Sequence, residues 1–151
     1  MYTKEEAQAI RHEFWHKLES KSRRAPGQNG KPIHWMMDKT GIRGLDLRFD
    51  LSGGRVMVGI EINTHSEEKD KKLWEKLVGC KILIEKNFEE PLTWDPEFVR
   101  EAGNTVHRAY VSTEGDIYNK EKWPEMLRFM IDNMMRMEKA YRSIQDYMMH
   151  F

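Results

Sequence analysis

Two stretches of this sequence contain residues whose types and spacing could support metal chemistry. The first reads H-E-F-W-H at residues 12–16, which is the H-E-x-x-H spacing of zinc peptidases. On a helix, two histidines four residues apart can bind one Zn²⁺, and the glutamate can polarise a metal-bound water. The apolar residues of the same segment also recur at helical spacing: Ala7, Ile10, Phe14 and Leu18. His12 and His16 fall nearly opposite that apolar face, so we expect them, with Glu13, to lie in solvent and to bind no metal.

The second stretch, R-V-M-V-G-I-E-I-N at residues 55–63, ends one residue away from a nuclease motif. Restriction-endonuclease-like enzymes bind Mg²⁺ through an Asp on one strand and a Glu on the next, and a Lys two residues after that Glu projects from the same face. Asp46 and Glu61 have the types for the two carboxylates, but the uncharged Asn63 stands at the lysine position. Arg48 lies on the same expected face, and an arginine is a poor general base. We therefore expect an ordinary solvated or ion-paired sheet face with no catalytic residue. The alternative is a divergent metal-dependent phosphodiesterase that uses Asp46 and Glu61.

A cationic stretch at residues 20–32 is expected to form a loop, because it is rich in Ser, Gly and Pro. It contains four basic residues and no acidic one, and Trp35 follows it: the cations are Lys21, Arg23, Arg24 and Lys31. Such a loop could contact a phosphate backbone while the aromatic ring stacks on a base. The whole chain, however, has 25 Lys and Arg against 25 Asp and Glu, so no net positive field supports binding to a polyanion. Nucleic acid is therefore the less favoured partner.

The size and composition of the chain restrict its class. Its 151 residues suffice for one domain with a core, which we place over residues 1–151, and the single Cys80 excludes an internal disulfide. No apolar run approaches the length of a membrane span or resembles a signal peptide. We expect a single cytoplasmic domain without membrane contact, and no motif indicates a cofactor.

The periodicity of the apolar residues predicts eight elements. Helices are expected from Thr3, where T-K-E-E has the spacing of a capping box, over residues 66–87, and from residues 119–124 to the end. Strands are expected over residues 33–37, 45–50, 55–63, 92–95 and 105–112. The order α-β-β-β-α-β-β-α with hairpin connections predicts an α+β two-layer sandwich. It would have a mainly antiparallel five-stranded sheet, helices on one face and a long C-terminal helix.

The clearest element is a β-hairpin with one apolar and one polar face. Its turn, L-S-G-G, allows two registers: a Ser52-Gly53 turn places Asp46 opposite Gly59, and a Gly53-Gly54 turn places it opposite Glu61. The alternation of side chains leaves both registers open. If the polar face is uncovered, we expect it to be a binding surface together with nearby polar residues: Arg43, Asp46, Arg48, Glu61, Asn63 and Arg108.

The last helix contains a heptad seam, in which apolar residues are spaced alternately three and four apart: Leu127, Met130, Met134, Met137, Tyr141, Ile144, Met148 and Phe151. A helix of about 27 residues spans roughly 40 Å, which exceeds the length of the expected strands. Part of the seam is therefore expected to overhang the sheet, where it could cover the first helix or pair with a second copy of the chain. A homodimer through the C-terminal helix is one possible partner arrangement.

Scattered residues along the chain form a further pattern: Phe14-Trp15, Trp35 before the run Lys39–Gly44, the run Gly59–Ile62, Trp94, Arg108 and Trp123-Pro124. In these features the chain resembles an uncharacterised bacterial family, the domain of unknown function 4268 (DUF4268), over almost its whole length. In longer relatives a similar domain follows a nuclease-like or other DNA-related domain. The resemblance therefore implies an accessory role in DNA processing or defence rather than the catalytic part. Our leading expectation is a non-enzymatic accessory or interaction domain that binds a partner protein.

Overall fold

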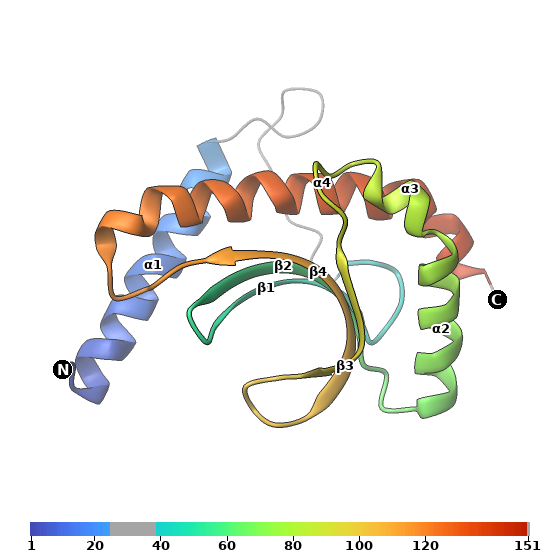
Figure 1. The fold of residues 1–151 in the computed structure, drawn as a ribbon, viewed down its shortest axis with the longest axis horizontal. Coiled ribbons are helices and arrows are strands. Elements are labelled where there is room, and N and C mark those ends of the chain that lie inside the picture. Colours follow the sequence, from blue (N-terminus) through green and yellow to red (C-terminus); the bar gives the residue numbers. More distant parts are fainter. Residues whose placement is uncertain (25–38, 151) are drawn as a thin grey trace.

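One antiparallel sheet lies at the centre of the computed structural model, which describes residues 1–24 and 39–150 (Figure 1). Its strands are β1 (Leu45–Ser52), β2 (Arg55–Ile62), β3 (Thr93–Val99) and β4 (Thr105–Glu114), in the spatial order β1-β2-β4-β3. The helices are α1 (Lys4–Arg24), α2 (Glu67–Gly79), α3 (Lys81–Glu85) and α4 (Trp123–Met149), and the 3-10 turn η2 (Lys120–Lys122) precedes α4. The predicted α+β class and the long C-terminal helix are confirmed. The sheet of the described residues has four strands rather than the expected five, and the expected strand at residues 33–37 lies outside them.

The segment expected as one helix over residues 66–87 forms two helices instead. Ser66 is the N-cap of α2, as predicted, and its side chain accepts a hydrogen bond from the Lys69 N–H. The helix ends at Gly79, and Cys80 separates it from α3. A glycine weakens a helix because it loses more conformational freedom on folding than any other residue. The apolar stripe continues across this break, which is why periodicity alone predicted one helix.

At the N-terminus, the predicted capping box is confirmed. The Glu6 N–H donates to the Thr3 hydroxyl (3.1 Å) and the Thr3 N–H donates to the Glu6 carboxylate (3.3 Å). The prediction that a loop begins at residue 20 was wrong, because α1 continues to Arg24. Ser22 is buried within that extension, and its hydroxyl donates to the Leu18 carbonyl (2.7 Å), so the helix itself satisfies this polar side chain.

The third strand of the described sheet is longer than the expected residues 92–95. Pro96 interrupts the alternation, yet β3 continues to Val99, with a shift in register between Asp95 and Phe98. β3 lies at the edge of the sheet, where a proline and a bulge are tolerated because one side of the strand needs no partner. The extension brings Phe98 and the residue after the strand, Arg100, to the sheet.

The β1–β2 hairpin has the second of the two possible registers, in which Asp46 lies opposite Glu61 and Ser52 opposite Arg55. Gly53 and Gly54 form the turn, and both have a positive φ (58° and 72°). A two-residue hairpin turn with positive φ at both positions matches the right-handed twist of the strands, and glycine adopts it without strain.

The apolar faces of the sheet and the helices form the core. Residues of α2, α3 and α4 pack on β1, β2 and β4, and α1 packs against α4 beside them. Every described residue of the predicted seam is buried: Leu127, Met130, Met134, Met137, Tyr141, Ile144 and Met148. This seam is satisfied within the chain, so it offers no apolar stripe to a second copy; Phe151 lies outside the described residues. Within residues 1–24 and 39–150, no helix is both long and apolar enough to cross a membrane.

The sheet is strongly curved (Figure 1). Helix α4 lies across its convex side, and the hairpin of β3 and β4 curls away from α4. The face that turns away from the helices is therefore concave, and it is the face on which the polar residues of β1 and β2 project.

Candidate functional site

The concave face carries a group of ionised side chains from β1, β2, β4 and the end of β3. In the observed register Asp46, Glu61 and Arg108 form one row across three strands. Alternate residues of a strand project from the same face, so the even-numbered residues of β1 join this row. With the first residue after β3, they form what we call the charged cluster: Asp46, Arg48, Asp50, Glu61, Arg100 and Arg108.

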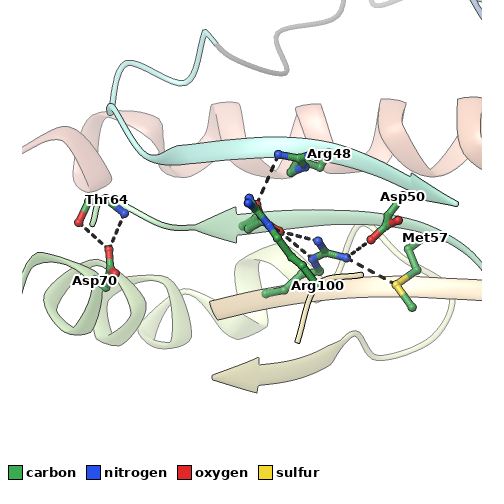
Figure 2. A network of polar contacts seen from close by, with 8 residues as sticks. Arg48, Asp50, Met57, Thr64, Asp70 and Arg100 are labelled. Carbon is green, nitrogen blue, oxygen red and sulfur yellow. Dashed lines mark hydrogen bonds and ion pairs between the residues drawn. The ribbon is translucent and has the colours of Figure 1, made fainter. Parts of the chain in front are cut away.

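Glu61 is at the centre of the charged cluster, and its side chain is only 1 % exposed. Arg108 donates to its Oε1 through Nε (3.1 Å) and Nη2 (2.5 Å). Arg100 donates to the same oxygen through Nε (3.3 Å) and forms an ion pair with Oε2 through Nη2. Arg48 lies farther away, with Nη1 3.6 Å from Oε2 (Figure 2). Both carboxylate oxygens are thus engaged by guanidinium groups.

Arg108 connects this carboxylate to the neighbouring strands. It is 3 % exposed, and its Nη1 donates to Asp50 Oδ2 (2.6 Å) and contacts the sulfur of Met57 (3.8 Å; Figure 2). The guanidinium carbon lies 3.9 Å from the centre of the Phe98 ring, a cation–π contact. The side chain of Arg108 therefore joins the bulged part of β3 to β2 and β1.

Gly59 of β2 makes room for Arg108. It lies opposite Tyr110 of β4 and opposite Arg48 of β1. A Cβ atom at Gly59 would lie 2.9 Å from the Ala109 carbonyl oxygen, 3.0 Å from Tyr110 Cβ and 3.3 Å from Arg108 Cγ. Because glycine has no side chain, the neighbouring strand and the arginine can lie across this position.

The electrostatics of the charged cluster favour the ionised forms of Glu61 and Arg100. Burial raises the pKa of the Glu61 carboxyl, but hydrogen bonds from Arg100 and Arg108, with the charges of Arg108 and Arg48, outweigh this effect and hold the pKa below its usual 4.5. The hydrogen bond to Glu61 raises the pKa of Arg100, and the charges of Glu61, Asp46 and Asp50 raise it further. Glu61 is therefore a carboxylate at neutral pH.

Comparison with known proteins identifies a family for this chain and gives no information on the charged cluster itself. The family described as "Domain of unknown function (DUF4268)" matches residues 10–145 of the 151-residue chain. The chain belongs to the DUF4268 family. No curated protein and no solved structure matches the chain significantly.

Four of the six predicted binding-surface residues of this DUF4268 domain lie in the charged cluster: Asp46, Arg48, Glu61 and Arg108. The other two lie apart from it. Arg43 is exposed in the turn before β1, and Asn63 follows the last residue of β2, where its backbone N–H donates to the Gly44 carbonyl (2.7 Å).

Sequence reasoning missed three contributors to the site. Asp50 was a recognisable candidate, because it continues the alternation of Asp46 and Arg48 along β1. Arg100 and Phe98 were not, because Pro96 and the bulge interrupt the period-two pattern that would have placed them on this face.

The H-E-x-x-H segment lies elsewhere, on α1. His12 and His16 are exposed there, and Glu13 pairs with Lys120 (Oε2 to Nζ, 2.8 Å). Among the residues that the structure describes, no three His, Cys, Asp or Glu side chains are grouped so that they could hold a metal ion. Residues 20–24 of the expected cationic loop form the end of α1. The rest of that loop and Trp35 lie outside the described residues.

The hydrogen bonds of the charged cluster make Glu61 a poor proton acceptor. A carboxylate that accepts hydrogen bonds from two guanidinium groups is a weak base, since its lone pairs are occupied and its pKa is lowered. Arg48 has a different character. Its side chain is 45 % exposed, and among the described residues its ion pair with Glu61 is long, at 3.6 Å, so the guanidinium is held less tightly than those of Arg100 and Arg108. This guanidinium can bind an acidic group of a partner.

Proposed function

We propose that this chain is a non-catalytic interaction domain whose concave sheet face, centred on the charged cluster, binds a partner protein. One observation supports this most directly. A fully buried Glu61 is held by two arginines on the sheet face that turns away from the helices. The buried ion pairs fix the shape of the sheet face on which Arg48 is exposed, and a preorganised surface favours specific recognition because the partner need not order it on binding.

The balance of charges favours a protein over a nucleic acid as the partner. The charged cluster has three arginines and three carboxylates, and the whole chain has a formal net charge of zero. A phosphate backbone is best bound by a surface with excess positive charge. A face of mixed sign is complementary to another face of mixed sign, which is typical of protein surfaces.

The same geometry disfavours the phosphodiesterase alternative. A divalent cation at Glu61 would have to displace Arg100 and Arg108 and would lie beside both positive charges. At about 4 Å, two like unit charges repel by about 4 kcal/mol per elementary charge near a protein surface, and a divalent ion doubles this. Asp46 and Glu61 are directly opposite on β1 and β2, as such a site requires, but both carboxylate oxygens of Glu61 already pair with Arg100 and Arg108.

Affinity capture with two matched variants tests the interaction surface. Arg48→Ala removes an exposed cation from the concave face. Lys72→Ala removes an exposed cation from α2, where it forms an i,i+4 ion pair with Glu68. We expect the same partner to be retained by wild type and Lys72→Ala and lost by Arg48→Ala, with all three chains equally folded. Equal capture by both variants would place the contact elsewhere and exclude the concave face.

A metal titration tests the alternative. We expect the melting temperatures of wild type and Glu61→Gln to show no difference in their response to Mg²⁺ or Mn²⁺, and neither protein to cleave DNA or RNA. A metal-dependent increase in the melting temperature that is present in wild type and absent in Glu61→Gln, together with cleavage, would establish the enzyme instead.

We further propose that the interaction takes place in the cytoplasm and serves DNA processing or defence. Support for the cytoplasm comes from Cys80, a lone and buried thiol that suits a reducing compartment. Support for the pathway comes from the family resemblance alone, so the identity of the captured partner is its test. Light scattering of the chain alone tells whether that partner is a second copy. A homodimer through the C-terminal helix would have to use the outer surface of α4, since its seam is buried.

A further inference from the structure

The outer edge of β4 is paired along only part of its length. Residues 105–110 of β4 pair with β3, and the last pair is Thr93 with Tyr110. β4 continues to Glu114, and β2 pairs with it on the other side as far as that residue. The backbone over residues 111–114 therefore has a strand on one side and none on the other within the described part of the chain.

The direction of the free backbone groups follows from the hydrogen-bond pattern. The Gly115 N–H donates to the Gly54 carbonyl (3.0 Å), so odd-numbered residues at this end of β4 direct their N–H and C=O groups toward β2. In an antiparallel ladder the direction alternates along the strand. The N–H and C=O groups of Ser112 and Glu114 consequently point to the open edge.

A proline explains why β3 does not cover this edge. In the register of β3 with β4, the residue that would lie opposite Ser112 is Pro91, two residues before Thr93. Proline has no N–H and cannot donate to the ladder. The chain instead turns toward α3, where Glu85 accepts hydrogen bonds from the Leu92 N–H (2.8 Å) and Trp94 Nε1 (3.1 Å) and so fixes the start of β3.

The space beside this edge is a cavity of about 310 Å³. It lies between residues 88–91, the edge of β4 and one side of α4. Phe88, Val111 and Phe129 supply apolar walls, and Asn133 and Arg136 supply polar ones. Pockets that hold small ligands begin at about this volume, so there is room for one large side chain and its backbone.

The charge at the mouth of the cavity is net negative. Arg136 Nη2 forms an ion pair with Glu89 Oε1 (3.2 Å), which joins α4 to the segment before β3. Glu90 is a second exposed carboxylate on the same wall. One cation thus faces two anions, and a positively charged group on an incoming chain would be attracted.

We propose that the β4 edge at Ser112 and Glu114 is a strand-addition site for an extended segment of a partner protein. The segment would place one apolar side chain in the cavity, against Phe88 and Phe129, and a basic residue beside Glu89 and Glu90. A row of outward-pointing backbone donors and acceptors is complementary to another extended backbone, which identifies a polypeptide strand rather than a small molecule as the occupant. The site contains no residue of the charged cluster, so its test and the test of the concave face give independent results.

Hydrogen exchange of the free chain and a peptide selection test this site. In the free chain, the amides of Ser112 and Glu114 are expected to exchange faster than those of Val111 and Thr113, because only the latter face β2. A library of random ten-residue peptides displayed on phage is then selected on wild type and counter-selected on Asn133→Phe, in which a larger side chain fills the cavity. Asp132→Phe, an exposed neighbour outside the cavity, is the control.

The expected result is a set of peptides with alternating apolar and polar residues, a basic residue near the anchor and no central proline. A synthetic peptide from this set should bind Asn133→Phe more weakly than wild type and Asp132→Phe by about tenfold or more. The same peptide should slow exchange at Ser112 and Glu114 in wild type, a measurement that does not depend on the folding of any variant. Two outcomes would overturn the site: equal exchange at all four residues in the free chain, or no peptide that protects Ser112 and Glu114.

Discussion

Substitution of the buried carboxylate, Glu61→Gln, is expected to destabilise the chain strongly. The change keeps the shape of the side chain but removes its charge, so Arg100 and Arg108 lose their common counter-ion. Removal of one partner from a buried ion pair costs about 3–5 kcal/mol, because it leaves an uncompensated charge. The lower end, about 3 kcal/mol, is expected here because Arg108 keeps Asp50 and Arg100 is 25 % exposed.

The assay is chemical denaturation and thermal melting of wild type, Glu61→Gln and a control. In a domain of this length each kcal/mol shifts the melting temperature by about 2–4 °C, so a fall of about 6–12 °C is expected for Glu61→Gln. Glu89→Gln removes a carboxylate that is 84 % exposed in its ion pair with Arg136, and an exposed pair contributes about 1 kcal/mol or less. The two glutamates thus differ in burial and share the chemistry of the substitution.

The pH dependence of the stability difference between wild type and Glu61→Gln is a second, independent measurement. The pKa of Glu61 in the folded chain lies below 4.5, its value in the absence of these interactions. A group whose folded-state pKa is lowered stabilises the fold fully above its unfolded-state pKa, and this contribution is lost as the pH falls through the folded-state value. The stability difference between wild type and Glu61→Gln should therefore be constant near neutral pH and shrink below pH 4.5. A difference no larger than that of Glu89→Gln, or one that does not shrink in acid, would refute the assigned role of Glu61.

Three further expectations concern other parts of the fold. Gly59→Ala should lower the free energy of unfolding by about 1–3 kcal/mol, because its Cβ would collide with the β4 backbone. At Gly79 the added Cβ has open space, so Gly79→Ala should leave that free energy unchanged or raise it by up to about 1 kcal/mol. Denaturation curves compare the two variants. Burial raises the pKa of Tyr141 to about 12, and its hydroxyl donates a hydrogen bond to the Thr40 carbonyl, so an absorbance titration should find one tyrosine that ionises there. Its contribution to stability is present below the unfolded-state pKa of 10.0 and lost as the pH rises through about 12, a loss that Tyr141→Phe should lack. Burial also raises the pKa of the Cys80 thiol, so this thiol should react with a disulfide reagent only when the chain unfolds, and rapid reaction of the native protein would contradict its position.

The faces of the β1–β2 hairpin could be predicted from the sequence because the side-chain period of a strand is two. The alternation in L-D-L-R-F-D alone assigns Asp46 and Arg48 to one face, and no tertiary contact is needed for this. The register was left open, although the sequence contains a signal for it. Only a Gly53-Gly54 turn places glycine at both positions that need a positive φ, and this is the turn observed.

The position of Arg100 could not be predicted from the sequence, because it depends on two irregular features. The bulge between Asp95 and Phe98 changes which side of β3 faces the concave surface, and a pattern with a period of two cannot locate it. The curl of the β3–β4 hairpin then brings Arg100 to Glu61, although 39 residues separate them in the sequence. The secondary-structure preferences of neighbouring residues cannot predict such a contact.

These irregular features also explain how a polar sheet face comes to contain buried charges. A flat sheet would leave the row of Asp46, Glu61 and Arg108 open to water, where ion pairs contribute little to stability. The curled hairpin places the Phe98 ring over Arg108 and the Arg100 guanidinium over Glu61, and so removes both from solvent. Once buried, each guanidinium needs its carboxylate, because an unpaired charge away from water is costly. The ion pairs of the charged cluster therefore stabilise the curled hairpin, and the curl in turn keeps these charges out of water.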